Sequence, residues 1–278
     1  SDVDFGDTPT YGLGGSVPSD DSDYQVMKVT AYGTLYLNTE TGDYKFVANN
    51  AAIQELDSDD ATVALDFSVS VTDGGTTVTD TLTITIDGAN DTPELAAVTG
   101  ATINDGTGND SFTDITGTLI GSDRDAAETL TYGLMGAVES TDPAFDWMKV
   151  TPYGTLYLDK DTGAYKFVAN NAAINGLDSD DAAVVLNFAL SVSDGDASDS
   201  KTLTITLNGA NDTPVLTGTA AALPNGVEDN AYTVTKAQLL EGWTDADEGE
   251  TLSITDFAAS NGTVTANADG SYTITPAA

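Results

Sequence analysis

Apolar and polar residues alternate along much of the chain, as they do in half-buried β-strands. At Leu82, Ile84 and Ile86 an apolar side chain stands at every second position, with a threonine between neighbours. One face of this segment is therefore apolar and the other polar. The run 67–72 (FSVSVT) alternates in the same way, and the DGGTT that follows it is typical of a turn. Residues 67–86 thus predict a β-hairpin.

Other segments show the same alternation, and they are rich in threonine, valine, tyrosine and isoleucine, which favour strands. Residues 34–48 (TLYLNTETGDYKFVA) predict a second hairpin around a glycine-containing turn. We expect one helical turn near 50–56 and another near 234–240. Short strands joined by regular turns favour an all-β fold, and we predict tandem antiparallel β-sandwiches of the immunoglobulin or cadherin type, arranged end to end.

The strand pattern repeats with a period of 121 residues. Residues 24–50 and 145–171 are identical at 19 of 27 aligned positions, and the register continues to an ANDTP motif at the end of each copy. We therefore predict two β-sandwich repeats, residues 1–92 and 93–213, of which the first lacks about 27 N-terminal residues relative to the second. Residues 214–278 differ from both repeats and are too few for a complete sandwich. We expect the chain to be a stretch of a longer tandem array.

The amino-acid composition excludes several classes of catalytic and metal-binding site. The 278 residues include no cysteine and no histidine, which excludes disulfides, thiol chemistry, a Ser-His-Asp triad and the commonest transition-metal ligand. Acidic residues number 45 against 8 basic ones, a net charge of −37. This balance excludes nucleic acid as a partner and favours a hard cation such as Ca²⁺. Because aromatic residues lie inside the strand runs, we expect a folded chain and not an acidic disordered one.

The chain contains no apolar run of roughly 20 residues, the length that crosses a membrane as a helix, so we expect no membrane insertion in this segment. Residues 1–10 (SDVDFGDTPT) have neither the basic region nor the apolar region of a signal peptide. We expect them to come from the middle of a longer polypeptide.

The order of motifs in each repeat resembles that of a known family. The block YKFVANNAAI, a DG turn, the strand TLTITI or TLTITL and a terminal ANDTP follow one another, and this order resembles the VCBS repeat of giant bacterial surface proteins, including RTX-type adhesins. Residues 214–278 carry EDN, DAD and DGSYTITP and are similar to a cadherin-like bacterial repeat. Tandem GGxGxDxUx nonapeptides are not present, and we expect residues 105–110 (DGTGND) to form a loop.

This resemblance implies β-sandwich modules joined in series, with calcium at their junctions. It also implies a secreted protein of the bacterial cell surface, exported by type I secretion, in which such modules form a stalk. The stalk would carry a distal binding region for cell adhesion or biofilm formation, and the partners of each module would be the neighbouring repeats of the same chain.

The ANDTP motifs lie where a strand ends, and they offer the side-chain oxygens that calcium prefers, while the proline restrains the backbone. The stretch from Asp87 resembles the cadherin linker pattern DxNDN, and the resemblance adds a DxD pair and an early acidic residue as partners. The candidate calcium ligands are Asp87, Asn90, Asp91, Asp123 and Asp125 at the first junction, and Asn208, Asn211, Asp212, Glu228, Asp229, Asp245 and Asp247 at the second. At the first junction the EDN motif has no counterpart, and Asp105 or Asp110 would have to replace it.

Alternatives remain for these motifs. Asn, Asp and Pro are turn residues, so ANDTP could be a turn without a ligand. The acidic loops 56–61 and 177–182 (LDSDDA) fit either further calcium ligands or solvated helix caps. The pairs Asp73-Gly74 and Asp194-Gly195 predict hairpin turns. Asp2 and Asp4 form the DxD pair of the first repeat, without junction partners in this chain.

The function we predict is that of a calcium-stiffened extender. A second hypothesis is carbohydrate binding, with Trp147, Tyr153 and Tyr157 forming an aromatic face for a polysaccharide. A third is a subunit of an extracellular filament or surface layer, whose modules contact other copies. Paired carboxylates could also serve a glycosidase, but nothing in the sequence marks one pair, and we expect no enzyme.

Overall fold

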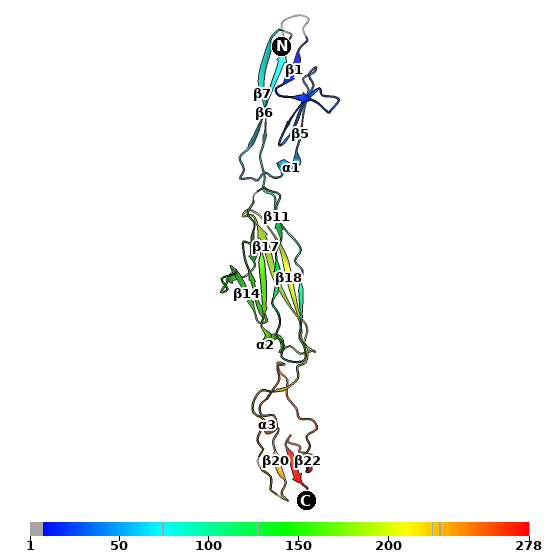
Figure 1. Cartoon of the computed structure of the whole chain (residues 1–278), viewed down its shortest axis with the longest axis vertical. Helices are drawn as coiled ribbons and strands as arrows, with labels where there is room; N and C mark the ends of the chain where they lie inside the picture. Colours follow the sequence, from blue (N-terminus) through cyan, green and yellow to red (C-terminus); the bar gives the residue numbers. More distant parts are fainter. Residues whose placement is uncertain (1–7, 74, 127, 224, 228, 278) are drawn as a thin grey trace. The chain divides into compact units, whose positions relative to one another are not determined.

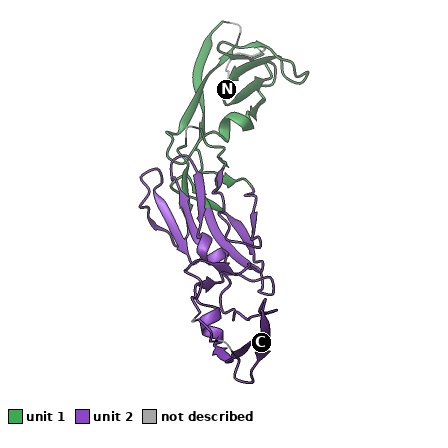
Figure 2. Ribbon diagram, turned by 60° about the horizontal axis from the view of Figure 1, so that its bottom comes forward, with its two compact units in different colours: residues 1–96, 120–133, 191–200 green, residues 97–119, 134–190, 201–278 purple. Residues whose placement is uncertain are grey.

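The structure is a computed structural model that describes residues 8–73, 75–126, 128–223, 225–227 and 229–277 (Figure 1). The chain divides into two compact units (Figure 2). One consists of residues 1–96, 120–133 and 191–200, and the other of residues 97–119, 134–190 and 201–278. Among the described residues, each helix is a single turn, and none is long and apolar enough to span a membrane.

The first repeat forms two antiparallel sheets, because its alternating segments each have one apolar face to bury. One sheet has the order β1-β6-β7 and contains β1 (Thr10–Leu13), β6 (Val63–Thr72) and β7 (Thr77–Ile86). The other has the order β2-β3-β4-β5 and contains β2 (Val17–Pro18), β3 (Val26–Thr30), β4 (Gly33–Leu37) and β5 (Tyr44–Ala48). The turn α1 (Asn50–Ile53) follows β5.

The second repeat forms the same two sheets, and each has one further strand. The first has the order β12-β17-β18-β9 and contains β12 (Thr131–Leu134), β17 (Val184–Ser193), β18 (Ser198–Asn208) and β9 (Ala101–Asn104). The second has the order β10-β16-β15-β14-β13 and contains β10 (Ile115–Thr118), β16 (Ala164–Ala169), β15 (Gly154–Leu158), β14 (Trp147–Thr151) and β13 (Val138–Glu139). The turn α2 (Asn171–Ile174) follows β16. The added strand β9 pairs parallel to β18, and the added strand β10 pairs antiparallel to β16.

The remaining strands are short. A two-stranded pair joins β8 (Glu94–Leu95) to β11 (Gly121–Ser122), and another joins β19 (Val215–Leu216) to β21 (Trp243–Thr244). A three-stranded sheet has the order β20-β23-β22 and contains β20 (Tyr232–Val234), β22 (Gly262–Ala266) and β23 (Tyr272–Pro276). The turn α3 (Lys236–Leu239) begins with a capping box, in which Thr235 and Gln238 satisfy each other's backbone N–H groups.

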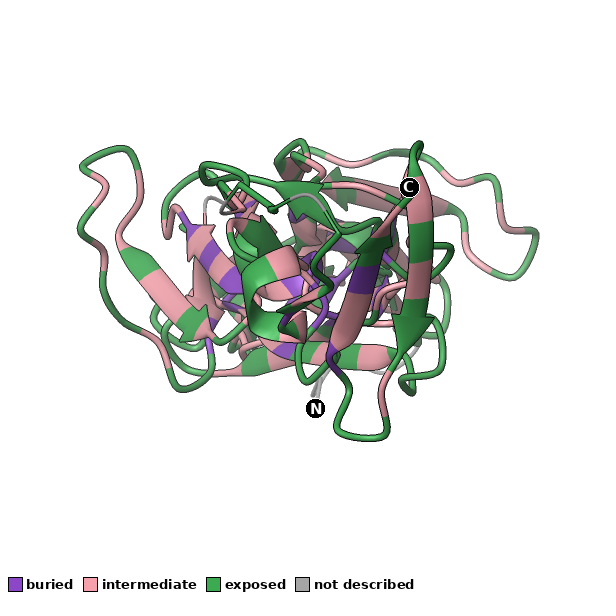
Figure 3. Cartoon of the chain, turned by 90° about the horizontal axis from the view of Figure 1, so that it is seen from below, coloured by how far each residue is buried: buried purple, intermediate pink, exposed green. Residues whose placement is uncertain are grey.

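Buried positions alternate with partly buried ones along β4, β15, β17 and β18, and Figure 3 colours these two classes purple and pink. Phe67 and Phe188, at equivalent positions of the two repeats, are 0% and 1% exposed. Each packs against a second phenylalanine, Phe46 or Phe167, with ring centroids 6.3 and 6.0 Å apart. Such aromatic pairs add to the free energy of burying the rings.

These features confirm the all-β fold class predicted from the sequence, with two antiparallel sheets in the first repeat and two larger sheets in the second. The predicted hairpin over residues 67–86 is β6–β7, paired from Val63–Ile86 to Thr72–Thr77. Both expected helical turns form, α1 and α3, and residues 105–110 form a loop. The domain boundaries read from the repeat stay a prediction.

Candidate metal centres

In each repeat the segment that ends in ANDTP packs against the acidic loop LDSDDA. The N–H of Ala89 donates to the carbonyl oxygen of Leu56 at 3.2 Å. A Cβ atom on Gly88 would collide with the carbonyl oxygen of Asp57, so only glycine allows this approach. The second repeat makes the same two contacts. The N–H of Ala210 donates to the carbonyl oxygen of Leu177 at 3.1 Å, and a Cβ atom on Gly209 would collide with the carbonyl oxygen of Asp178. The same tertiary contact therefore brings the two acidic motifs together in both repeats.

The first acidic cluster forms where the first ANDTP meets residues of the second repeat. It consists of Asp57, Asp59, Asp91, Asp123, Asp125, Asp194 and Asp196. The N–H of Asp91 donates to Oδ2 of Asp125 at 2.6 Å, and the N–H of Asp125 donates to Oδ1 of Asp123 at 3.0 Å. A cavity of about 460 Å³ opens beside these residues and is lined by Asp91, Thr92, Glu94, Ser122, Asp123 and Arg124.

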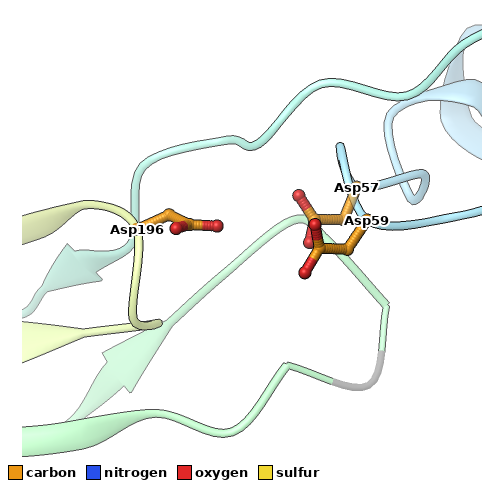
Figure 4. A group of neighbouring side chains, drawn as sticks. All are labelled: Asp57, Asp59 and Asp196. Carbon is orange, nitrogen blue, oxygen red and sulfur yellow. The ribbon is translucent and has the colours of Figure 1, made fainter.

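Three carboxylates of this cluster face one another. Asp57 and Asp59 come from the acidic loop and point toward Asp196, which lies in the turn between β17 and β18 (Figure 4). One oxygen of each lies within 4.8 Å of the others. Next to them, Nδ2 of Asn90 donates to Oδ2 of Asp194 at 3.3 Å. The turn and the loop thus bring three carboxylate oxygens close together.

The second acidic cluster has the same plan around the second ANDTP. It consists of Asp105, Asp110, Asp178, Asp212, Asp245 and Asp247. The N–H of Asp212 donates to Oδ2 of Asp247 at 2.7 Å, and the N–H of Asp247 donates to Oδ1 of Asp245 at 3.2 Å. The two clusters therefore share one arrangement, an ANDTP aspartate bound to the second aspartate of a DxD turn.

Both clusters bury carboxylate oxygens that have no hydrogen-bond partner. In the described part of the chain, the buried side-chain oxygens and nitrogens without a partner are all in these clusters: Oδ1 and Oδ2 of Asp212, Oδ1 of Asp247, Oδ2 of Asp105, Oδ1 of Asp125 and Oδ2 of Asp123. Asp212 is only 2% exposed and Asp125 only 5%. A buried unpaired carboxylate costs several kcal/mol of stability unless an opposite charge compensates it.

The electrostatics of the clusters point the same way. Burial, followed by the charges of Asp105 and Asp247, raises the pKa of Asp212 from 3.8 to about 6. Burial also raises the pKa of Asp105, of Asp125 and of Asp247, and neighbouring carboxylates add to each of these shifts. The carboxylates of each cluster therefore repel one another, and a divalent cation would neutralise their negative charge.

A third group of acidic residues is different. One oxygen of each of Asp146, Asp159 and Asp161 lies within 4.8 Å of the others. Here, however, Nζ of Lys160 lies 3.1 Å from Oδ1 of Asp146 and 3.1 Å from Oδ2 of Asp161. The lysine already supplies the positive charge, so this group is not a candidate centre.

Of the ligands predicted from the sequence, the ANDTP and DxD aspartates are brought together as expected: Asp91 with Asp123 and Asp125, and Asp212 with Asp245 and Asp247. The asparagines of ANDTP lie beside them. Nδ2 of Asn90 and of Asn211 each donates to the carbonyl oxygen of the next aspartate, at 2.9 and 2.7 Å.

Other predicted ligands lie elsewhere. Asp87 is exposed, and its Oδ1 accepts from Oγ1 of Thr62 at 2.6 Å. Its equivalent Asn208 donates from Nδ2 to Oδ1 of Asn104 at 2.7 Å. Asp229 is exposed, with a backbone φ of 59°, and is not among the described carboxylates that act on Asp212 and Asp247. Glu228, Asp2 and Asp4 lie outside the described residues.

One expectation is corrected. The sequence offers Asp105 or Asp110 as a replacement for the EDN motif at the first junction, but the structure places both in the second cluster. The reason is topological. Because β9 runs parallel to β18, the two strands end at the same edge, and the N–H of Asp105 donates to the carbonyl oxygen of Asn208 at 2.9 Å.

The sequence analysis assigns Asp194-Gly195 to a hairpin turn and does not single out Asp196, although both aspartates lie in the first cluster. A signal was present, because Asp194 and Asp196 have the same D-x-D spacing as residues 123–125 and 245–247. The sequence also leaves open whether the acidic loops 56–61 and 177–182 hold ligands or cap helices. The structure places Asp57 of the first loop and Asp178 of the second in the clusters.

Comparison with known proteins gives one family match. A family model of the cadherin-like domain matches residues 210–278. A sequence search against curated proteins returned no match.

Solved structures with similar coordinates include human protocadherin-24 EC1-2 (13% identity, 74% of this chain and 83% of that chain, TM-score 0.31). Another is the protocadherin gamma B2 extracellular region, domains 1–5 (18% identity, 98% and 46%, TM-score 0.37). A third is an endo-fucoidan hydrolase of glycoside hydrolase family 107 (16% identity, 96% and 35%, TM-score 0.29). The present chain spans less than half the length of the last two.

Proposed function

We propose that both acidic clusters bind calcium and that the chain is a structural extender. In this proposal it is part of the stalk of a large secreted bacterial surface adhesin, of the VCBS or RTX type, that projects a distal binding region for adhesion or biofilm formation. Its partners are the neighbouring repeats of the same polypeptide, its location is the cell surface, and it catalyses no reaction.

The observation that supports this proposal most is the set of buried oxygens without partners, above all both oxygens of Asp212. A protein does not bury an ionised carboxylate without a compensating charge, and the clusters supply only further acids. A bound cation is the simplest group that satisfies these oxygens together.

Calcium fits the donor set better than other metals. The ligands are carboxylate, amide and backbone oxygens, which hard cations prefer, and the chain has no histidine or cysteine for a softer metal. Calcium accepts six to eight oxygens in a flexible geometry, whereas magnesium needs a near-octahedral shell and keeps several waters. Seven aspartates in the first cluster and six in the second suit the larger ion.

The position of the clusters gives the ion a mechanical role. In the first cluster, Asp57 and Asp91 belong to the first repeat, while Asp125 and Asp196 belong to the second. An ion held by both sets would fix one repeat to the next. Without the ion the carboxylates repel one another, and the connection would loosen. This coupling supports an extender whose stiffness depends on calcium.

The carbohydrate hypothesis receives less support from the aromatic residues. Trp147 is 37% exposed. Tyr157, however, packs on Phe145 with ring centroids 5.7 Å apart, and Nζ of Lys166 lies 5.3 Å from its ring centroid. The ring of Tyr157 is thus engaged in a packed cation–π group, which leaves it less free to bind a sugar.

Titration calorimetry of the calcium-stripped chain tests the binding proposal. We expect saturable calcium binding that the combined change Asp125→Asn and Asp212→Asn abolishes or weakens at least about tenfold. The matched control is Asp161→Asn, which removes an acid from the lysine-paired group. Absence of binding to the unchanged protein, or equal binding by the double variant, would refute the proposal.

A further inference from the structure

One loop of the second repeat, residues 105–112, carries two acids of the second cluster. Asp105 follows directly on β9, and its N–H donates to the carbonyl oxygen of Asn208 at 2.9 Å, so the strand pairing fixes it. Asp110 lies five positions further on, past Gly106 and Gly108, where the described chain forms no strand. Because glycines give such a stretch much conformational freedom to lose, a contact outside the loop has to hold Asp110 in place.

The side chain of Asn175 binds both backbone polar groups of Asp110. The N–H of Asp110 donates to Oδ1 of Asn175 at 2.7 Å, and Nδ2 of Asn175 donates to the carbonyl oxygen of Asp110 at 3.0 Å. The same Nδ2 donates to the carbonyl oxygen of Asn171 at 2.8 Å. Asn175 is only 4% exposed. A side-chain amide offers both the donor and the acceptor that these bonds need, whereas leucine or an ionised aspartate would not.

Neighbouring residues of α2 extend this contact in two directions. Oδ1 of Asn171 accepts from the N–H of Phe112 at 3.2 Å. The carbonyl oxygen of Gly176 accepts from the N–H of Glu248, the residue that follows the DAD turn, at 3.1 Å. The α2 turn and the two residues after it therefore hold the loop 105–112 on one side and the DAD turn on the other.

The carboxylate of Asp110 turns toward the other acids of the cluster. A Cβ atom on Gly106 would lie 2.5 Å from Oδ2 of Asp110, so this carboxylate folds back over the glycine. Burial first, and then charges that include those of Asp105 and Asp110, raise the pKa of Asp212 to about 6. Both side-chain oxygens of Asp212 are buried without a partner. The loop thus brings two carboxylates to a buried acid that lacks a compensating charge.

We propose that Asn175 is a positioning residue of the second calcium centre, which holds the carboxylate of Asp110 among the ligands by binding the backbone of that residue. This inference rests on the proposed function, because it assigns Asp110 to an ion at that centre. Residues that orient metal ligands matter for affinity, and loss of such a partner typically weakens metal binding by about tenfold to about a hundredfold. Asn175 acts on the ion through Asp110 and does not itself bind it.

Calcium titration calorimetry tests the proposal in the full chain carrying Asp125→Asn, which disables the first centre so that the second is measured alone. Asn175→Ala should weaken calcium binding at least about tenfold. Asn170→Ala is the matched control and should leave the affinity unchanged, because Nδ2 of Asn170 donates to the carbonyl oxygen of Pro152, at 2.9 Å, and not to the loop. Equal affinity of the Asn175→Ala variant and its parent would overturn the proposal.

A double-mutant cycle shows whether Asn175 acts through Asp110. In a chain with Asp110→Asn, which lacks the carboxylate, Asn175→Ala should change calcium affinity by less than about twofold. An undiminished effect would overturn the proposal, since the asparagine would then act only by stabilising the fold. Gly106→Ala crowds the same carboxylate and leaves Asn175 in place, so it should weaken binding too. Gly108→Ala should not, because a Cβ there meets no atom within 4 Å.

Hydrogen exchange in EDTA separates this proposal from calcium binding itself. Without calcium, the amide of Asp110 should exchange at least about tenfold faster in Asn175→Ala, because its acceptor is gone, and at an unchanged rate in Asn170→Ala. An unchanged rate in Asn175→Ala would overturn the positioning role. A chain that shows the expected exchange rates but binds no calcium would refute the proposed function, and the role of Asn175 at a calcium centre with it.

Discussion

The main-chain N–H of Asp212 donates to Oδ2 of Asp247 at 2.7 Å, while both carboxylate oxygens of Asp212 are buried without a partner. The hydrogen bond fixes the ANDTP motif of the second repeat to the DAD turn of the following segment. It also holds two carboxylates close together where water does not reach them. In the proposed function, a cation would offset the repulsion between these carboxylates and so stabilise the connection.

Removing one of these charges should stabilise the calcium-free protein and weaken its affinity for calcium. Asp212→Asn keeps the shape of the side chain and removes the buried charge, so the calcium-free protein should gain about 1–3 kcal/mol of unfolding free energy at neutral pH. Calcium affinity should fall at least about tenfold. Chemical denaturation in EDTA and calorimetry with calcium measure the two quantities. A variant that is less stable in EDTA would contradict the account.

The raised pKa of Asp212 predicts how the calcium-free protein responds to pH. Its carboxyl holds a proton up to about pH 6 in the native state but only up to its ordinary value of 3.8 in the unfolded chain. Between these values the native state binds more protons, so its stability falls as the pH rises through this window and is lowest above it. The shift corresponds to on the order of 3 kcal/mol, and burial raises the pKa of Asp125 and Asp247 in the same direction.

Denaturation by urea in EDTA at about pH 4.5 and about pH 7 checks this expectation. With saturating calcium the order should reverse, because the ion binds the ionised form and protons compete with it. A calcium-free protein that becomes more stable as the pH rises from 4.5 to 7 would show that the buried carboxyls are not the dominant groups.

The glycine before the second ANDTP should be needed for both stability and binding. A Cβ atom on Gly209 would collide with the carbonyl oxygen of Leu177, which is backbone and cannot move aside. Gly209→Ala should therefore cost about 2 kcal/mol or more and displace Asp212 from the acidic loop. Gly108→Ala is the matched control, because a Cβ there meets no atom within 4 Å. Equal stability of the two variants would show that the loop yields to the added methyl group.

Asp196 should contribute to the first centre although it lies in a hairpin turn. Asp196→Asn removes one of three carboxylates that lie within 4.8 Å of one another, so it should weaken calcium binding at that centre several-fold and leave the second centre unchanged. Terbium luminescence, with the second centre disabled by Asp212→Asn, isolates the effect. Should terbium bind equally with and without the Asp196 carboxylate, the turn would have no role in the centre.

The sequence predicts the strands well because alternation has a local cause. The alternation at Leu82, Ile84 and Ile86 fixes which face of β7 is apolar, and the internal repeat carries the same conclusion to β18. The ANDTP and DxD motifs are likewise local, and their pairing follows from the order of the repeats. These parts of the fold and of the candidate centres could therefore be predicted.

Other parts depend on which strands end together, which is a tertiary property. Asp105 reaches the second cluster because β9 pairs parallel to β18. The sequence around Asp105 does not predict that pairing. Asp196 reaches the first cluster because the β17–β18 turn lies beside the loop of Asp57 and Asp59. Spacing alone marks such residues as turns, and only the strand topology shows which motifs they meet.

Small-angle X-ray scattering of the chain, first in calcium and then in EDTA, tests the central claim most directly. If calcium holds consecutive repeats in fixed orientations, the particle should have a larger and better-defined maximum dimension in calcium and should become more flexible in EDTA. The variant with Asp125→Asn and Asp212→Asn should give the EDTA profile even in calcium. Identical profiles of the unchanged protein under both conditions would contradict the account, since the acidic clusters would then not govern how the repeats are connected.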